Sequence, residues 1–293
     1  SSLSTLRRGF GVTYVGGWGS YLAHDGGSGD WRRILEHPSY LRSVAAGGGK
    51  VWIGGDQAFV AVEDGSGWRR VPWKTTHGAS VTGLWVDASG VAWAVTSDGR
   101  IARYDATSGE LVQEHHDSRG LRAIWGSSAQ SLVAVGDYGT ILARDASSAW
   151  TAQSGPGNEY WRGIWGSGPM DIYIVGGRGK VARYNGTSWA PVAVGALEEQ
   201  DLYAVHGRSA QDVWVVGNSG LVWRLDNASW RAVAGKGALS HDKDLRGVYV
   251  APSGRAWIVA AGDGVVYSGL DDPITVIGIV EHMNLDGESG LEA

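Results

Sequence analysis

The chain of 293 residues contains no cysteine, only two phenylalanines and two methionines, and little charge of either sign. The lack of cysteine excludes a disulfide framework, a thiolate metal site and a cysteine nucleophile. No apolar run reaches the ~18 residues that a membrane helix requires, and we recognise no signal-peptide core, so no membrane span is predicted. The formal net charge of −5 argues against nucleic-acid binding, which normally requires a basic surface.

The residues that are abundant are glycine, with 47 copies, and tryptophan, with 16. Glycine at this level, without the period of collagen, indicates many tight turns. Tryptophan at this level indicates one recurring packing role. Hydrophobic residues make up 43% of the chain, which is enough for a large core and does not favour disorder.

A unit of about 40 residues recurs along the chain, which is the length of a propeller blade. The phrase GIWGSGPMDIYIVGGRGKVARYNGTSW (163–189) returns as AVHGRSAQDVWVVGNSGLVWRLDNASW (204–230). Seven copies cover nearly the whole chain, and their first strand-like stretches begin at Leu3, Leu41, Val81, Leu121, Trp161, Leu202 and Leu245.

Each copy carries four short strand signals and no convincing helical period. The first resembles LRAIW (121–125) and the second resembles DVWVVG (212–217). A glycine-bearing turn follows, which supplies the positive φ of a tight hairpin, and the third strand ends in Asp or Asn. The fourth strand begins at a tryptophan in five copies: Trp31, Trp68, Trp150, Trp189 and Trp230. These signals predict an all-β fold, a seven-bladed β-propeller with four antiparallel strands per blade.

The predicted domain boundaries follow from the repeat. Residues 1–280 form the propeller, with 274–280 as the outermost strand of the last blade, and 281–293 form an acidic C-terminal tail. We expect the ring to close by packing, without a strand shared between its two ends. The repeated tryptophans are expected to pack between adjacent blades, each burying on the order of 4–6 kcal/mol of gross transfer free energy. An indole N–H can also donate to a backbone carbonyl.

The candidate binding site is one mouth of the axial channel, because function usually lies on variable loops over a rigid frame. The second residue of the first strand is arginine in four blades, so these side chains should crowd one rim: Arg42, Arg122, Arg162 and Arg246. Four guanidinium groups require something negative between them. An anionic ligand, a partner's acidic loop and the chain's own carboxylates all stay open, the last being Glu198, Glu199, Asp201, Asp242 and Asp244.

Other residues of the same rim are also candidates for binding. Tyr203 occupies the arginine position in another blade, and Trp18, Tyr138 and Arg178 lie at tips of hairpin turns. Exposed aromatic residues and arginine are favoured at protein interfaces.

Catalytic and metal-binding patterns are weak. Five of the eight histidines lie in the rim loops, but no metal-ligand spacing such as HExxH is present, so we predict no metal and no cofactor. The best candidates for acid–base chemistry are His115, His116, Asp117 and His241.

Charged residues elsewhere in the repeat have expected structural roles. Asp171 and Asp212, on the opposite rim, are expected to cap the turn into the second strand. The third-strand arginines Arg103, Arg183 and Arg224 are expected to face solvent.

The consensus IWGSxxxDVWxVGxxGxIxRYDGxxW, matched best by 164–189 and 205–230, resembles a bacterial propeller repeat that is common in secreted or lipid-anchored proteins, notably of myxobacteria. It is also similar to tectonin lectins and to photosystem II assembly-factor propellers. The resemblance extends from residue 3 to about 280 and implies the propeller fold and an extracytoplasmic location. The Asp-box of sialidases and the GPDGxLWFTE repeat of streptogramin lyases are absent.

The fold hosts many functions, so three hypotheses remain. The first is a non-catalytic binding scaffold that docks a protein, an acidic peptide or another anionic ligand through the loop rim and the arginine-lined mouth. The alternatives are a carbohydrate-binding lectin and an enzyme with its site at the channel mouth. We favour the scaffold because no catalytic constellation is evident, and we expect a monomer or a module of a larger assembly.

Overall fold

The computed structural model describes residues 3–9, 12–17, 21–24, 32–36, 40–74, 78–195, 197, 199–233, 243–261, 265–269 and 275–279. The strands of the first three blades are β1–β4 (Leu3–Gly9, Val12–Gly17, Tyr21–His24, Arg32–Glu36), β5–β8 (Leu41–Gly47, Lys50–Gly55, Val60–Glu63, Trp68–Arg70) and β9–β12 (Val81–Val86, Ala92–Thr96, Arg100–Asp105, Glu110–His116). The next two blades contain β13–β16 (Leu121–Ser128, Ser131–Gly136, Ile141–Arg144, Trp150–Ala152) and β17–β20 (Trp161–Gly168, Asp171–Gly176, Val181–Tyr184, Trp189–Val192). The last two contain β21–β24 (Leu202–Ser209, Asp212–Gly217, Val222–Asp226, Ser229–Ala232) and β25–β28 (Leu245–Val250, Ala256–Ala260, Val265–Gly269, Thr275–Ile279). Two 3-10 turns, η1 (Asp137–Gly139) and η2 (Gly177–Gly179), follow β14 and β18.

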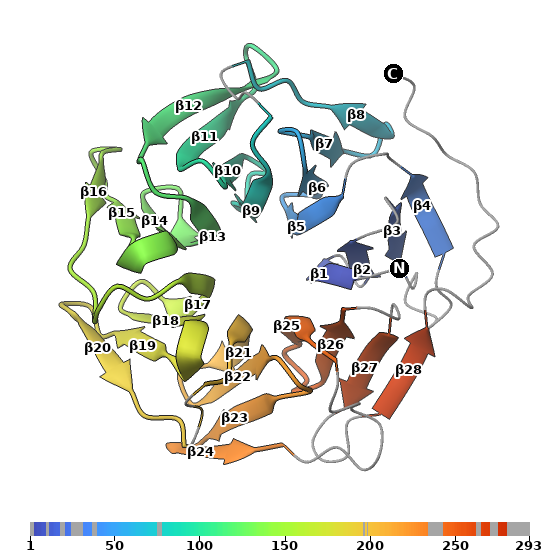
Figure 1. The fold of residues 1–293 in the computed structure, drawn as a ribbon. Coiled ribbons are helices and arrows are strands. Elements are labelled where there is room, and N and C mark those ends of the chain that lie inside the picture. The colour runs from blue at the N-terminus through green and yellow to red at the C-terminus, as the bar shows by residue number, and fades with distance from the viewer. Residues whose placement is uncertain are drawn as a thin grey trace.

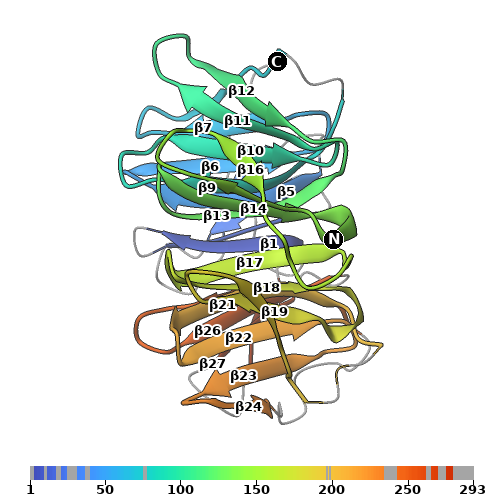
Figure 2. The same cartoon turned by 90° about the vertical axis from the view of Figure 1, so that its left-hand side faces the viewer.

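These strands form seven four-stranded antiparallel sheets, which we call blades 1 to 7 in chain order. The blades surround a central axis, with the first strand of each blade innermost and the fourth outermost (Figure 1). Seen edge-on, the strands run across the thickness of the ring (Figure 2). The predicted fold class, a seven-bladed all-β propeller, is confirmed. No helix among the residues described above is long and apolar enough to cross a membrane.

The ring closes by packing between its first and last blades. Strands β1–β4 form a sheet of their own, as do β25–β28, and β1 contacts β25 and β26 across the gap. The outermost strand of blade 7 is β28, Thr275–Ile279. The acidic tail at 281–293 lies outside the described residues, so the domain boundary stays a prediction.

The hydrophobic core consists of clusters that each combine residues of two neighbouring blades. One cluster joins Trp93 and Val95 of blade 3 to Leu132, Leu142 and Trp150 of blade 4. Of the fourth-strand tryptophans, Trp150 is buried, whereas three others are only partly buried: Trp68, Trp189 and Trp230. The largest fully buried indoles are instead Trp52, Trp93, Trp161 and Trp214, on first and second strands.

A third tryptophan position explains why the repeat reads Trp-Gly. Trp125, on the innermost strand of blade 4, packs against Gly166 of blade 5, where an added Cβ would lie 2.7 Å from the indole Cη2 atom. Equivalent contacts join Trp85 to Gly126 and Trp165 to Gly207. The expectation of one recurring role for tryptophan is therefore wrong, because it has distinct positions on first, second and fourth strands.

Carboxylates accept the indole N–H groups of Trp93, Trp150 and Trp214. The buried Nε1 atoms of Trp52 and Trp161, in contrast, have no hydrogen-bond partner among the residues that the structure describes. Glu114 on β12 accepts from the Nε1 atoms of Trp93 at 3.3 Å and of Trp150 at 3.1 Å. The same carboxylate binds Arg144 of blade 4 through its Nε and Nη2 atoms at 3.1 and 3.2 Å, and Arg103 through its Nε atom at 3.2 Å. Glu114 therefore links blades 3 and 4.

Asp212 plays a similar part in blade 6, which corrects the prediction for Arg224. Its Oδ1 atom accepts from Trp214 Nε1 at 3.2 Å and from Arg224 Nε at 2.8 Å. Arg224 is only 7% exposed and its guanidinium stacks over Trp214, so the prediction that it faces solvent is wrong. Asp171 likewise binds Arg183, so both aspartates hold arginine side chains of their own blade. Asp171 also accepts a hydrogen bond from the Ser167 hydroxyl in the turn before the second strand.

Candidate binding site at the channel mouth

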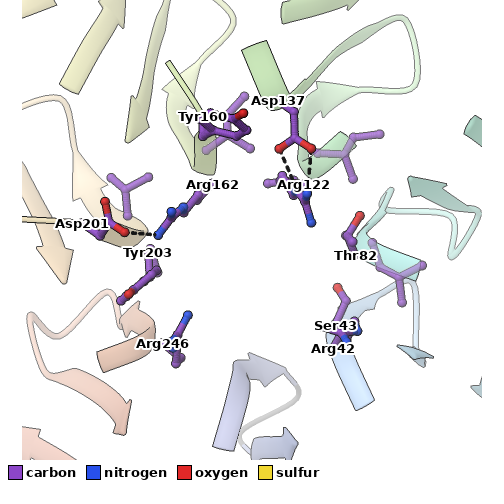
Figure 3. Close-up of a pocket in the computed structure, with 18 of the residues that line it drawn as sticks. Arg42, Ser43, Thr82, Arg122, Asp137, Tyr160, Arg162, Asp201, Tyr203 and Arg246 are labelled. Atoms are coloured by element: carbon purple, nitrogen blue, oxygen red, sulfur yellow. Dashed lines mark hydrogen bonds and ion pairs between the residues drawn. The ribbon is translucent and has the colours of Figure 1, made fainter. Parts of the chain in front are cut away.

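An axial cavity of about 830 Å³ opens between the innermost strands of blades 2 to 7 (Figure 3). The first strand of each blade lies next to the axis, and the second residue of this strand lines the cavity in blades 2 to 7. Five of the predicted site residues line this cavity: Arg42, Arg122, Arg162, Tyr203 and Arg246. We call this ring of residues the channel mouth.

In blades 2 and 4 the mouth arginine is paired within its own blade. The Nε and Nη2 atoms of Arg122 donate to the two carboxylate oxygens of Asp137 at 2.8 and 2.6 Å. Arg42 makes the same two-pronged contact with Asp56. Both aspartates come directly after the second strand, so the hairpin turn holds each guanidinium in place.

In blades 5 to 7 the partners come from the blade-to-blade loops. Arg162 Nη1 donates to Asp201 at 2.8 Å, and Arg246 Nη2 donates to Asp244 at 2.6 Å. The ring of Tyr203 lies near both guanidinium groups, 5.1 Å from Arg162 Cζ and 3.9 Å from Arg246 Cζ. Burial raises the pKa of Tyr203, against the opposing effect of Arg246, so the protonated hydroxyl donates to Asp244.

One aspartate balances the charge of each mouth arginine, but the arginines reach the lining of the cavity more often than their partners do. The lining includes four arginines but only two aspartates, Asp137 and Asp201. The arginine side chains are between 33% and 42% exposed. A guanidinium has five N–H donors, and the bonds to Asp occupy one or two of them within the described part of the chain. The mouth can therefore offer oriented N–H donors to an anion.

The other predicted site residues lie beside the cavity or outside the described residues. Tyr138 and Arg178 occupy equivalent positions in η1 and η2, with φ of 54° and 56°. These turns are held to the next blade, as in the bond from Gly139 N to Glu159 O at 2.7 Å. Trp18 lies outside the described residues. All eight site assignments stay predictions as binding residues.

Sequence reasoning missed four residues that line the cavity or hold its arginines: Tyr40, Asp56, Asp137 and Tyr160. The aspartates could have been found, because a Gly-Asp pair follows the second strand at 55–56 and at 136–137. Tyr160 directly precedes the innermost strand of blade 5, and Tyr40 has the same place in blade 2. Both tyrosines line the cavity.

The candidate acid–base residues do not meet at the mouth. His115 and His116 lie on β12, the outermost strand of blade 3, and neither lines the cavity. Asp117 is bound to Arg119 at 3.0 Å, and His241 lies outside the described residues. No group of three or more metal-ligating side chains occurs in the described part of the chain.

The pairing of Asp56 predicts a dependence on pH. Burial acts to raise the pKa of Asp56, but hydrogen bonds from Arg42 and Ser80 outweigh it and hold the pKa below its ordinary value. A carboxyl whose pKa is lowered by folding stabilises the protein above the unfolded pKa of about 3.9, and this contribution is lost as pH falls through the folded pKa. We expect Asp56→Asn to destabilise at neutral pH and the difference from wild type to shrink below about pH 4. Urea unfolding of both proteins at a series of pH values measures the difference in their free energies of unfolding. If this difference stays constant down to pH 3, about one unit below the unfolded pKa, the prediction is wrong.

Comparison with known proteins supports the fold and leaves the activity open. No protein-family model and no curated protein matches the sequence. Among solved structures, YCF48 bound to D1 peptide is 16% identical, with a TM-score of 0.69, covering 89% of this chain and 90% of that one. The WD40 propeller of Doa1 is 13% identical, with a TM-score of 0.74 and coverage of 91% and 92%. Virginiamycin B lyase from Staphylococcus aureus is 13% identical, with a TM-score of 0.74 and coverage of 88% and 92%.

These likenesses and the blade architecture define the chain as a β-propeller. The photosystem II assembly-factor propellers, which the repeat resembles, are thus matched in fold. The streptogramin lyase is also matched in fold, although its sequence repeat is missing here. At such low identity the likeness concerns the fold alone, because one scaffold carries many functions.

Proposed function

We propose that this propeller is a non-catalytic binding module that docks an acidic segment of a partner protein at the channel mouth. The observation that carries the proposal is a single cavity into which four blades each direct a partly exposed arginine. Each of these arginines is oriented by a carboxylate of its own protein.

The chemistry of the mouth suits carboxylates. Guanidinium groups bind carboxylates through paired N–H donors, and a guanidinium already fixed by Asp loses less conformational entropy when it binds. The Asp partners also neutralise enough charge for four arginines to coexist in the empty cavity. A flexible acidic segment can reach several blades at once, whereas a small anion can contact only a few of the arginines in about 830 Å³.

A propeller of the same fold supports the choice of a peptide ligand. YCF48 has been solved with D1 peptide bound, so a disc of this shape can hold a peptide. The packed clusters between blades make the disc rigid, and a rigid frame under variable loops favours recognition.

A labelled peptide of alternating glutamate and serine tests the proposal by fluorescence anisotropy. We expect it to bind the wild type, and the affinity to fall as salt rises because part of the attraction is screened. The double charge reversal Arg122→Glu with Arg162→Glu should weaken binding at least about tenfold, equivalent to about 1.4 kcal/mol.

A matched control makes the same charge change away from the mouth. Arg183→Glu with Arg231→Glu alters arginines on outer strands whose side chains are 43% and 41% exposed and also paired with Asp. This control should bind the peptide as the wild type does, apart from a small effect of net charge. Absence of binding to the wild type, or equal weakening in both double variants, would refute the proposal. Glycan binding that survives the reversal at the mouth would favour the lectin alternative.

A further inference from the structure

We infer that Tyr138 and Tyr160 form an aromatic half of the same docking site, which receives a large apolar side chain next to the acidic residues of the partner segment. The inference rests on the proposed function and adds a specificity element to it. It concerns blades 4 and 5, where the hairpin turn η1 faces the loop before β17.

The two rings are neighbours and both are exposed. Their centroids are 5.0 Å apart with an interplanar angle of 53°. Tyr138 is 58% exposed and Tyr160 is 41% exposed. Within the described part of the chain only Val112 and Met170 are comparably exposed large apolar residues, and neither lines the cavity. Two such aromatic residues side by side indicate a contact surface, because aromatic anchors carry much of the energy of protein interfaces.

The backbone at Tyr138 supports the same conclusion independently. Its φ of 54° and ψ of 42° lie in the left-handed region, which is uncommon for bulky residues. The turn does not require tyrosine, since Arg178 and Ser219 occupy the equivalent left-handed positions of the next two blades. Burial does not explain the ring either, because it is largely exposed. The left-handed turn belongs to the repeat, so neither the turn nor burial accounts for an exposed tyrosine at this position.

The aromatic pair is continuous with the arginine site. Tyr160 lines the cavity, and Figure 3 shows it on the same side of the opening as Asp137 and Arg122. Tyr138 follows Asp137, the aspartate that holds Arg122. The hydrogen bond with Tyr138 raises the pKa of Tyr160, and a phenol is uncharged at neutral pH even without this shift, so Tyr160 does not repel a carboxylate. A ligand with a carboxylate beside a large apolar group fits both halves.

Two labelled peptides of equal charge test the inference. One alternates glutamate and serine, and the other has one central serine replaced by tryptophan. We expect the wild type to bind the tryptophan peptide about tenfold more tightly, which is the range of a single interface anchor. Tyr138→Asn and Tyr160→Ser should each reduce this preference to about twofold or less, while affinity for the glutamate–serine peptide changes less than about twofold.

Folding and position are controlled separately. Asparagine tolerates the left-handed conformation, so Tyr138→Asn should unfold at the wild-type temperature or higher although it loses the preference. Tyr184→Ser removes a tyrosine that packs on Trp189 in the outer strands and should keep the preference. Equal binding of both peptides by the wild type, or a preference that survives both rim substitutions, would overturn the inference and leave the proposed function standing. Failure of both peptides to bind would overturn the two together.

Discussion

Replacing Glu114 with glutamine is expected to lower the free energy of unfolding by about 3–5 kcal/mol, the typical cost of breaking a buried ion pair. The substitution keeps the size of the side chain and removes its charge. Arg144, whose side chain is 7% exposed, would then lose its only carboxylate partner among the described residues while staying buried. The bonds from Trp93, Trp150 and Arg144 Nε all end on the Oε2 atom, whose place the amide oxygen can take. The amide nitrogen then stands in the place of Oε1 and, as a donor, faces the donors Arg144 Nη2 and Arg103 Nε.

Glu110→Gln is the matched control, because it makes the same change on the same strand. Glu110 pairs with Lys74, whose side chain is 74% exposed, so the loss should be at most about 1 kcal/mol. Urea unfolding followed by tryptophan fluorescence measures both variants. If the two destabilise equally, the carboxylate of Glu114 does not hold blades 3 and 4 together in the way that its contacts indicate.

The repeat was sufficient to predict the fold because its spacing is set by packing between blades. A tryptophan on one innermost strand requires a glycine on the next, as Trp125 and Gly166 show, so the pair must recur once per blade. The distribution of tryptophan over three strand positions was not predicted. The sequence does not show whether a tryptophan at the start of a fourth strand or one within a second strand is the more buried. The packing of neighbouring sheets decides this.

Part of the candidate site was also predictable, because strands in equivalent blades begin at the same level. The second residue of each innermost strand therefore falls at the same mouth, which places Arg42, Arg122, Arg162 and Arg246 around one cavity. The aspartates that pair with these arginines were less predictable. Asp201 and Asp244 were among the candidate carboxylates. The Gly-Asp pair marks Asp56 and Asp137 in the sequence, but their contact with arginine depends on how the hairpin turn folds back over its own first strand.

The buried arginines show where pattern reasoning fails. Arg224 occupies the third-strand position at which Arg103 and Arg183 remain about two-fifths exposed. Arg144, which is also buried, lies one residue further along its own third strand. Burial of arginine is tolerated only where a carboxylate and an aromatic face meet it, and both come from tertiary contacts, as with Asp212 and Trp214. Alternation along the strand carries no information on such partners.

Gly166→Ala should lower the free energy of unfolding by about 1–3 kcal/mol, the usual cost of overpacking a well-packed contact. The added Cβ would lie 2.7 and 2.8 Å from two indole atoms of Trp125 and 2.9 Å from the backbone oxygen of Asp171. Gly166 is buried between blades 4 and 5, so neither the backbone nor the ring can move aside without disturbing its neighbours. The cost is steric, because the backbone of Gly166 does not lie in the left-handed region.

Gly168→Ala separates this steric effect from a general effect of replacing glycine in the strand. It lies two residues further along β17, has no atom within 4 Å of an added Cβ, and has no positive φ. We therefore expect the free energy of unfolding of Gly168→Ala to equal that of the wild type or to exceed it slightly, because alanine lowers the conformational entropy of the unfolded chain. Trp125→Phe should partly rescue Gly166→Ala, because the smaller ring lacks the indole atoms that the new Cβ would meet. Thermal and urea unfolding of the wild type and four variants test this: the three single variants and the double variant of Gly166→Ala with Trp125→Phe. Equal losses at Gly166 and Gly168, with no coupling to Trp125, would mean that the Trp-Gly step does not set the spacing of the blades.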